Sequence, residues 1–135
     1  MENLVIKAKK NNIKLVIDKK EYDLHYSFRI YIIYESAVGR NLDFDRLTLS
    51  DLYILFYASI IATLQYNKIE HSLKYDELMN IIDECGGEYI LTTFSSWFVD
   101  KMKQQAELLR ESNEEVEEGK KKYLKKTKKE TLESN

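Results

Sequence analysis

Few residues in this sequence have the chemistry of an enzyme or a metal centre. The chain contains two histidines, His25 and His71, and a single cysteine, Cys85. A four-ligand zinc site needs paired cysteines or histidines a few residues apart, and these three residues do not have that spacing. We therefore expect no metal, and we expect Cys85 to be a small buried hydrophobe at a helix end rather than a nucleophile.

Carboxylates and glycines do not form a recognisable site either. Most acidic residues in 43–51 and 76–84 fall at predicted helix starts or on solvated faces. The glycines at positions 39, 86, 87 and 119 lack the pattern of a phosphate-binding loop. The sequence therefore predicts a protein that is not an enzyme and has no cofactor.

Aromatic residues are better candidates, for binding rather than catalysis. The chain has ten tyrosines, and their apolar rings and polar hydroxyls suit half-buried surfaces that meet a partner. The alternative is that these tyrosines complete the core of a small domain. The same two interpretations apply to Trp97 and Phe98, because helical spacing alone explains them as core residues.

A lysine-rich run, GKKKYLKKTKK at residues 119–129, has the charge to contact a polyanion. No folded element is predicted to present it, so a solvated tail is the alternative interpretation. Net charge over the whole chain is −2, which gives no general attraction for nucleic acid or anionic lipid. The candidates for phosphate contact are Lys120, Lys121, Lys122, Lys125 and Lys126.

The length of 135 residues suits one domain, expected at residues 1–110, and a charged tail at 111–135. The longest apolar run, residues 52–64, is shorter than the roughly 20 residues that cross a bilayer, and no signal peptide is recognisable. A single cysteine is typical of a reducing compartment. We expect a cytoplasmic protein with no membrane partner.

Short β-prone runs at residues 4–6 and 13–17 flank KAKKNN, whose asparagines tolerate the left-handed backbone of a hairpin turn. A third run, EYDLHYS at 21–27, alternates apolar and polar residues. Together they predict an antiparallel β-meander over residues 3–26.

The segment FRIYIIYE, residues 28–35, is ambiguous. Its isoleucines and tyrosines favour a strand buried on both faces, whereas Ser27 suits a helix N-cap and Gly39 stands where a C-cap would. We predict a helix over residues 28–38, with the strand as the alternative.

Three further helices are predicted. TLSD at 48–51 is a capping box that starts an apolar helix at 49–66, placed at the centre of the domain. A shorter helix at 75–85 ends at a glycine pair, and a fourth spans 88–110. The fold class is thus α+β and mainly α, a small antiparallel β-meander packed on about four helices with a charged, partly disordered C-terminal tail.

The order of these segments resembles the tail assembly chaperones of long-tailed bacteriophages. The family's strand, polar turn, strand and glycine-ended helix are similar to IKLVIDKKEYDLHYSFRIYIIYESAVGRNLDF, its central apolar helix to LTLSDLYILFYASI, and its short acidic helix to LKYDELMNIIDE. The likeness covers about residues 13–102 and includes no catalytic residue. The extra N-terminal strand, the tyrosine-rich first helix and the lysine-rich tail depart from the family pattern.

The resemblance implies a chaperone in the host cell cytoplasm that holds the long, helical tape measure protein soluble until tail tube subunits polymerise around it. Its implied partners are the tape measure protein, the tail tube protein and further copies of itself. We expect a binding groove between the central and fourth helices, lined by Tyr53, Tyr57, Trp97 and Phe98. Some family members also have a longer frameshifted form, for which the codons of Lys120 to Lys122 are a candidate slippery site.

Two other classes stay open. One is a small adaptor or inhibitor, of an anti-defence or antitoxin-like kind, that covers another protein with its tyrosine-rich helices. The other is a nucleic-acid accessory protein that uses the lysine-rich tail. Salt separates them, because binding through the tail weakens steeply with salt and capture of an apolar helix does not.

Overall fold

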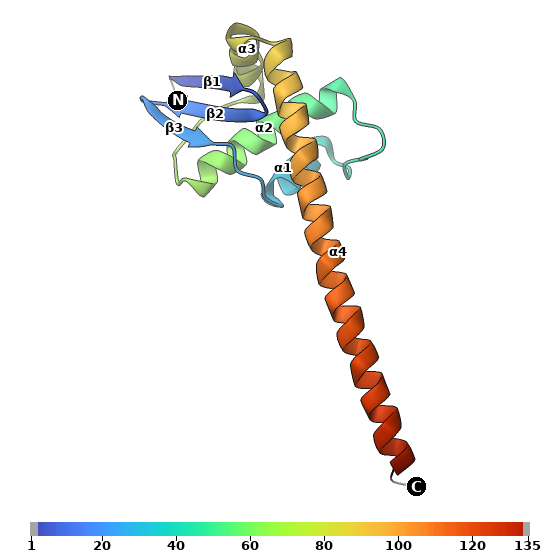
Figure 1. The fold of residues 1–135 in the computed structure, drawn as a ribbon. Helices are drawn as coiled ribbons and strands as arrows, with labels where there is room; N and C mark the ends of the chain where they lie inside the picture. Colours follow the sequence, from blue (N-terminus) through green and yellow to red (C-terminus); the bar gives the residue numbers. More distant parts are fainter. Residues whose placement is uncertain (1–2, 134–135) are drawn as a thin grey trace. The chain divides into compact units, whose positions relative to one another are not determined.

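A computed structural model describes the backbone of residues 3–133 and the side chains of residues 3–113. Three strands precede four helices (Figure 1), so the predicted fold class is confirmed. Packing divides the chain into two units, Met1–Val99 and Asp100–Asn135. The elements are β1 (Leu4–Lys9), β2 (Asn12–Ile17), β3 (Lys20–Asp23), α1 (Arg29–Val38), α2 (Leu49–Tyr66), α3 (Tyr75–Cys85) and α4 (Glu88–Glu133).

The three strands form one antiparallel sheet in the order β1-β2-β3. In the second hairpin, Asp18 and Lys19 both have positive φ, as a type I′ turn requires. In the first hairpin Lys10, not an asparagine, takes the left-handed conformation, with φ 57°. β3 is also shorter than predicted and ends at Asp23, although the Leu24 N–H still donates to the Ile13 carbonyl at 3.3 Å.

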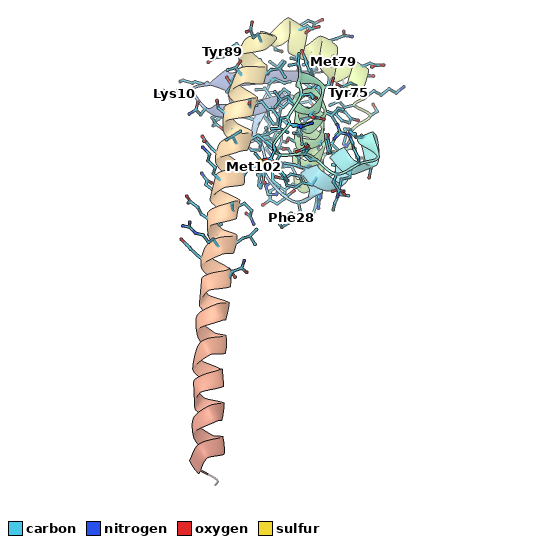
Figure 2. The ribbon with its side chains drawn as sticks, turned by 90° about the vertical axis from the view of Figure 1, so that its right-hand side faces the viewer. Lys10, Phe28, Tyr75, Met79, Tyr89 and Met102 are labelled. Carbon is cyan, nitrogen blue, oxygen red and sulfur yellow. The ribbon has the colours of Figure 1, made fainter. Side chains whose placement is uncertain are left out.

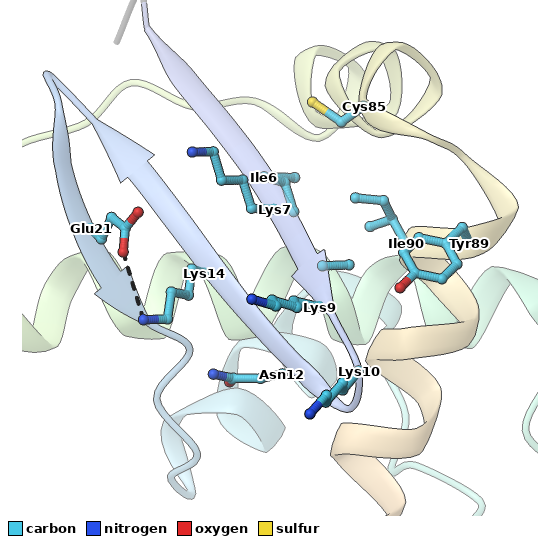
Figure 3. Close-up of a pocket in the computed structure, with 11 residues that line it drawn as sticks. Ile6, Lys7, Lys9, Lys10, Asn12, Lys14, Glu21, Cys85, Tyr89 and Ile90 are labelled. Atoms are coloured by element: carbon cyan, nitrogen blue, oxygen red, sulfur yellow. Dashed lines mark ion pairs between the residues drawn. The ribbon is translucent and has the colours of Figure 1, made fainter.

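Alternation along the strands separates a buried face from an exposed one. Leu4, Ile6, Ile13, Leu15 and Ile17 are all buried. α2 crosses behind the sheet in Figures 1 and 3, with ten of its 18 residues buried. The opposite face of the sheet carries mostly charged side chains.

The ambiguous segment is a helix, as predicted, but its N-cap differs. Phe28 occupies the N-cap position without a side-chain hydrogen bond, and Ser27 contributes only its carbonyl, which accepts from the Ile30 N–H at 3.1 Å. The prediction of a Ser27 cap was therefore wrong, because Ser27 lies one residue too early. Gly39 ends the helix at φ 78°, and its N–H donates to the Glu35 carbonyl at 2.7 Å.

The capping box of α2 is confirmed. The Asp51 N–H donates to the Thr48 hydroxyl and the Thr48 N–H donates to the Asp51 carboxylate, both at 3.1 Å. By length and composition α2 also resembles a membrane span, but 56% of that window is buried inside the protein. Core helices of folded domains have the same composition.

α3 ends at Cys85 as predicted, with positive φ at Gly86 and Gly87. α4 begins at Glu88 as predicted but continues to Glu133, well past the expected end at Arg110. No proline interrupts this segment, and Gly119 alone costs only about 1 kcal/mol of helix propensity. The predicted partial disorder of the tail, residues 111–135, is not tested by the helical assignment and stays a prediction.

Candidate protein-binding surfaces

Of the four residues predicted to line a groove between the second and fourth helices, only Tyr53 does so. This α2–α4 groove, of about 540 Å³, lies between the start of α2 and the start of α4. Its apolar side chains are flanked by the acidic residues Asp83 and Glu88. The groove is lined by Leu49, Leu52, Tyr53, Asp83, Gly87, Glu88, Leu91, Thr92, Ser95 and Ser96.

Tyr57 has a structural role instead. Its hydroxyl donates to the Leu73 carbonyl at 3.0 Å, and its ring meets Tyr75 edge to face at 5.7 Å between centroids. These contacts tie α2 to the segment that enters α3. Tyr57 is thus positioned by intramolecular contacts rather than presented to a partner.

Trp97 and Phe98 belong to the core, so the structure does not place them on a binding surface. Trp97 is 6% exposed and Phe98 is fully buried. Both rings stack on Phe94, at 5.8 and 5.7 Å, and Phe94 meets Phe56 of α2 at 4.6 Å. This aromatic cluster fastens the start of α4 to α2.

The structure instead exposes a different set of large apolar side chains. Phe28 is 64% exposed, Ile32 62% and Phe44 55%, and the half-buried Tyr31 lies among them. The Tyr31 ring contacts Phe28 at 6.5 Å and Phe44 at 5.9 Å between centroids. We call Phe28, Tyr31, Ile32 and Phe44 the aromatic surface; Figure 2 shows Phe28 at the periphery of the first unit.

Helix periodicity explains the aromatic surface. Ile30 and Tyr34 are fully buried against the core, and residues two positions away along a helix point to the opposite side. Phe28 and Ile32, four residues apart, are therefore neighbours on the outer side. Sequence reasoning does not name these residues as binding candidates, because the run 28–34 is apolar on all sides; the spacing of Ile30 and Tyr34 is the available signal.

Tyr31 connects this surface to the core. Its hydroxyl pairs with the Tyr26 hydroxyl, and its ring lies 6.1 Å from Phe98 between centroids. Burial and the Tyr26 contact raise the pKa of Tyr31 far above its usual value, so the hydroxyl is uncharged. The aromatic surface thus rests on a fixed tyrosine and has no charge at its centre.

A buried carboxylate holds α1 against α2. Asp51 is 2% exposed and accepts a hydrogen bond from the Tyr34 hydroxyl at 2.5 Å and one from Arg40 at 3.2 Å. The bond from Tyr34, more than the Thr48 and Arg40 contacts, lowers the pKa of Asp51. Burial, and then the bond to Asp51, raises the pKa of Tyr34. This network positions α1 and with it the aromatic surface.

The reactive residues of the sequence are scattered. Among the described side chains, no group of three or more His, Cys, Asp or Glu could hold a metal ion. His25 stacks on Tyr66 at 3.8 Å between centroids, and Cys85 is a free, half-buried thiol. The side chains of Lys120, Lys121, Lys122, Lys125 and Lys126 lie outside the described residues.

Comparison with known proteins adds no relative from which to argue. No protein-family model, curated protein or solved structure matches the chain. The surfaces described above are therefore interpreted from their own chemistry.

Proposed function

We propose that this chain is a non-enzymatic protein-binding protein, a phage tail assembly chaperone that holds the tape measure protein soluble during tail morphogenesis. The observation that carries the proposal is the aromatic surface, where three large apolar side chains are more than half exposed around Tyr31. Contiguous exposed apolar surface is typical of protein interaction sites. The identity of the partner comes from the sequence resemblance.

The aromatic surface has the chemistry to cover an amphipathic helix. A helical partner would place its apolar stripe over Phe28, Ile32 and Phe44. Full burial of such a side chain contributes about 1.5–3 kcal/mol, so completing the burial of three half-exposed ones contributes about 2–4 kcal/mol. On its own that amount corresponds to a dissociation constant of about 1 mM or weaker, so the aromatic surface supports reversible capture, and retention through a wash needs a second contact.

The α2–α4 groove supports the same proposal as a second contact. Its apolar floor includes Leu52, Tyr53 and Leu91, and its acidic flank includes Asp83 and Glu88. A helix with an apolar stripe bordered by lysine or arginine complements this arrangement. Such helices are expected in a long helical partner that aggregates when free.

The test is co-purification from cells that express the protein with its native gene neighbourhood. The tagged protein is captured and washed at high salt, and bound proteins are identified by mass spectrometry. A very long, helix-rich protein retained at high salt is the expected result, since apolar contacts resist screening. Nucleic acid released by salt would support the accessory-protein alternative, and a single compact protein would support the adaptor or inhibitor.

A matched pair of variants locates the contact. Phe28→Ser with Ile32→Ser removes the two most exposed side chains of the aromatic surface and should reduce retention of the partner roughly tenfold. Leu108→Ser with Leu109→Ser removes two leucines that are also more than half exposed, at 59% and 51%. Equal losses for both pairs would indicate general apolar adhesion and contradict the proposal.

A further inference from the structure

The outer edge of β1 is not paired with another strand among the described residues, although α3 packs against β1. The two-residue turn at Asp18 and Lys19 makes Ile17 and Lys20 a hydrogen-bonded pair. The backbone groups of odd-numbered residues in β2 therefore form hydrogen bonds with β3, and those of even-numbered residues form hydrogen bonds with β1. By the register of the first hairpin, Val5, Lys7 and Lys9 then bond β2. The N–H and C=O groups of Leu4, Ile6 and Ala8 are left on the outer edge.

This edge opens into a groove of about 790 Å³. Ile6 and Ala8 contribute to one wall, while Cys85 at the end of α3 and Tyr89 and Ile90 at the start of α4 contribute to the other. Figure 3 shows these two walls facing each other across the groove. The β1-edge groove, as we call it, combines an unpaired strand edge with an apolar lining.

Lysines surround the same groove. Lys7, Lys9 and Lys14 project from one face of β1 and β2 (Figure 3), and Lys10 lies in the adjoining turn. Lys7 and Lys14 are directly opposite each other on adjacent strands. Like charges in such a cross-strand pair destabilise the sheet. Among the described side chains, only Lys14 of these four is within ion-pair distance of a carboxylate, Glu21 at 3.6 Å.

We propose that the β1-edge groove binds an extended, acidic segment of a partner protein, which adds to the sheet as a fourth strand beside β1. Backbone groups of the segment pair with those of Ile6 and Ala8, the outward-directed residues that line the groove. Alternate carboxylate side chains lie over Lys7 and Lys9. The site is separate from the aromatic surface and does not depend on the chaperone proposal.

Charge argues against a second copy of β1 in the groove, and backbone chemistry argues against nucleic acid. A second copy of β1 would bring its own lysines against these lysines, and lysines on an edge strand are a known device against such self-pairing. Nucleic acid would complement the positive charge of the lysines, but its backbone has no hydrogen-bonding pattern that matches a strand edge. Bases bind by stacking on aromatic rings, and Tyr89 is the one aromatic residue in the lining of the groove. An acidic peptide uses both the free edge and the lysines.

The probe is a fluorescein-labelled peptide with the sequence Glu-Val-Glu-Thr-Glu-Val-Glu-Thr, and its binding to the full chain is measured by fluorescence anisotropy at low salt. We expect binding that weakens as salt rises. Replacing every glutamate in the peptide by lysine should abolish it. N-methylation tests strand addition directly, because only one of the two alternate sets of peptide amides faces β1. Methylating that set should abolish binding, and methylating the other should leave it.

Charge-reversal variants test the groove. Lys7→Glu with Lys9→Glu should weaken peptide binding roughly tenfold or more, since each exposed pair is lost and replaced by repulsion. The matched control, Lys103→Glu with Arg110→Glu, makes the same change in net charge at two exposed positions of α4. Ala8→Pro removes one outward N–H without breaking the ladder to β2, and should also weaken binding.

Four outcomes would overturn the proposal: no binding of the glutamate peptide, equal loss in the two charge-reversal pairs, indifference to both sets of N-methylation, or displacement of the peptide by a mixed-sequence single-stranded oligonucleotide at equal charge. Circular dichroism of each variant confirms that it is folded. Phe28→Ser with Ile32→Ser should leave peptide binding unchanged, so failure here is distinguishable from failure of the chaperone proposal.

Discussion

Tyr34→Phe tests whether the buried Asp51 carboxylate holds α1 on α2. The substitution removes one hydroxyl and leaves the ring, which is fully buried, in place. The Asp51 carboxylate then loses its 2.5 Å hydrogen bond from Tyr34 but keeps its contacts with Arg40 and Thr48. Any loss of stability therefore reports on this bond rather than on a cavity.

The expected magnitude follows from the charge of the acceptor. A hydrogen bond to a charged group contributes about 1.5–3 kcal/mol, and Asp51 at 2% exposure gains little compensation from water. We expect the free energy of unfolding to fall by about 2 kcal/mol near neutral pH. For a unit of this size that corresponds to a decrease in Tm of about 10 °C.

The loss should depend on pH in a defined direction. Because the hydrogen bond from Tyr34 lowers the pKa of Asp51 below the ordinary 3.8, the ionised carboxylate stabilises the folded state. That contribution is complete above about pH 4 and is lost as the pH falls through the depressed folded pKa. The difference between wild type and Tyr34→Phe should therefore shrink in acid to about 1 kcal/mol, the value for a neutral hydrogen bond.

Urea unfolding followed by circular dichroism, near pH 7 and near pH 3, measures both quantities. Tyr53→Phe is the control, since Tyr53 is half-buried and has no hydrogen bond among the described side chains; we expect a change within about 0.5 kcal/mol. A loss below about 0.5 kcal/mol for Tyr34→Phe, or a loss that does not change with pH, would refute the reasoning.

Three further predictions concern the elements that position the surfaces. Thr48→Ala removes the capping hydroxyl of α2 and should reduce the free energy of unfolding by about 1 kcal/mol in the same urea assay. Phe98→Ala empties a fully buried site in the aromatic cluster and should cost about 3–5 kcal/mol, measured by thermal unfolding; a loss under about 1 kcal/mol would contradict the core assignment. Burial, and then Arg29, lowers the pKa of His25 below 6.5, so the stability gained from the neutral ring is complete above pH 6.5 and is lost as the pH falls toward the folded pKa. In His25→Gln the free energy of unfolding should fall less as the pH is lowered. A pH profile of urea unfolding identical to that of the wild type would contradict this prediction.

Helix boundaries were largely predictable from the sequence because they depend on short-range signals. The capping box at Thr48 and Asp51 and the glycines after residues 38 and 85 each act within a few residues, and the structure confirms all of them. Ser27 was misjudged because a cap depends on the exact register of the first turn. The end of α4 was misjudged because a polar helix has no apolar stripe that stops at its terminus.

The binding surfaces were less predictable. The sequence placed Tyr53, Tyr57, Trp97 and Phe98 on helices correctly, but helical spacing is the same for a core residue and a surface residue. Trp97 and Phe98 stack on Phe94, and Phe94 meets Phe56, which lies 38 residues earlier in the chain. No local pattern reports a contact over that separation.

By itself, then, the sequence determined the type of each element, most of the boundaries apart from the end of α4, and the absence of a recognisable catalytic motif, because propensity, caps and turns are local. Only the tertiary structure decided which aromatic residues face outward, that Asp51 joins α1 to α2, and that lysines, a free strand edge and the start of α4 share one groove. Each of these depends on packing between segments far apart in the chain. Whether a side chain is exposed depends on that packing and not on its residue type alone.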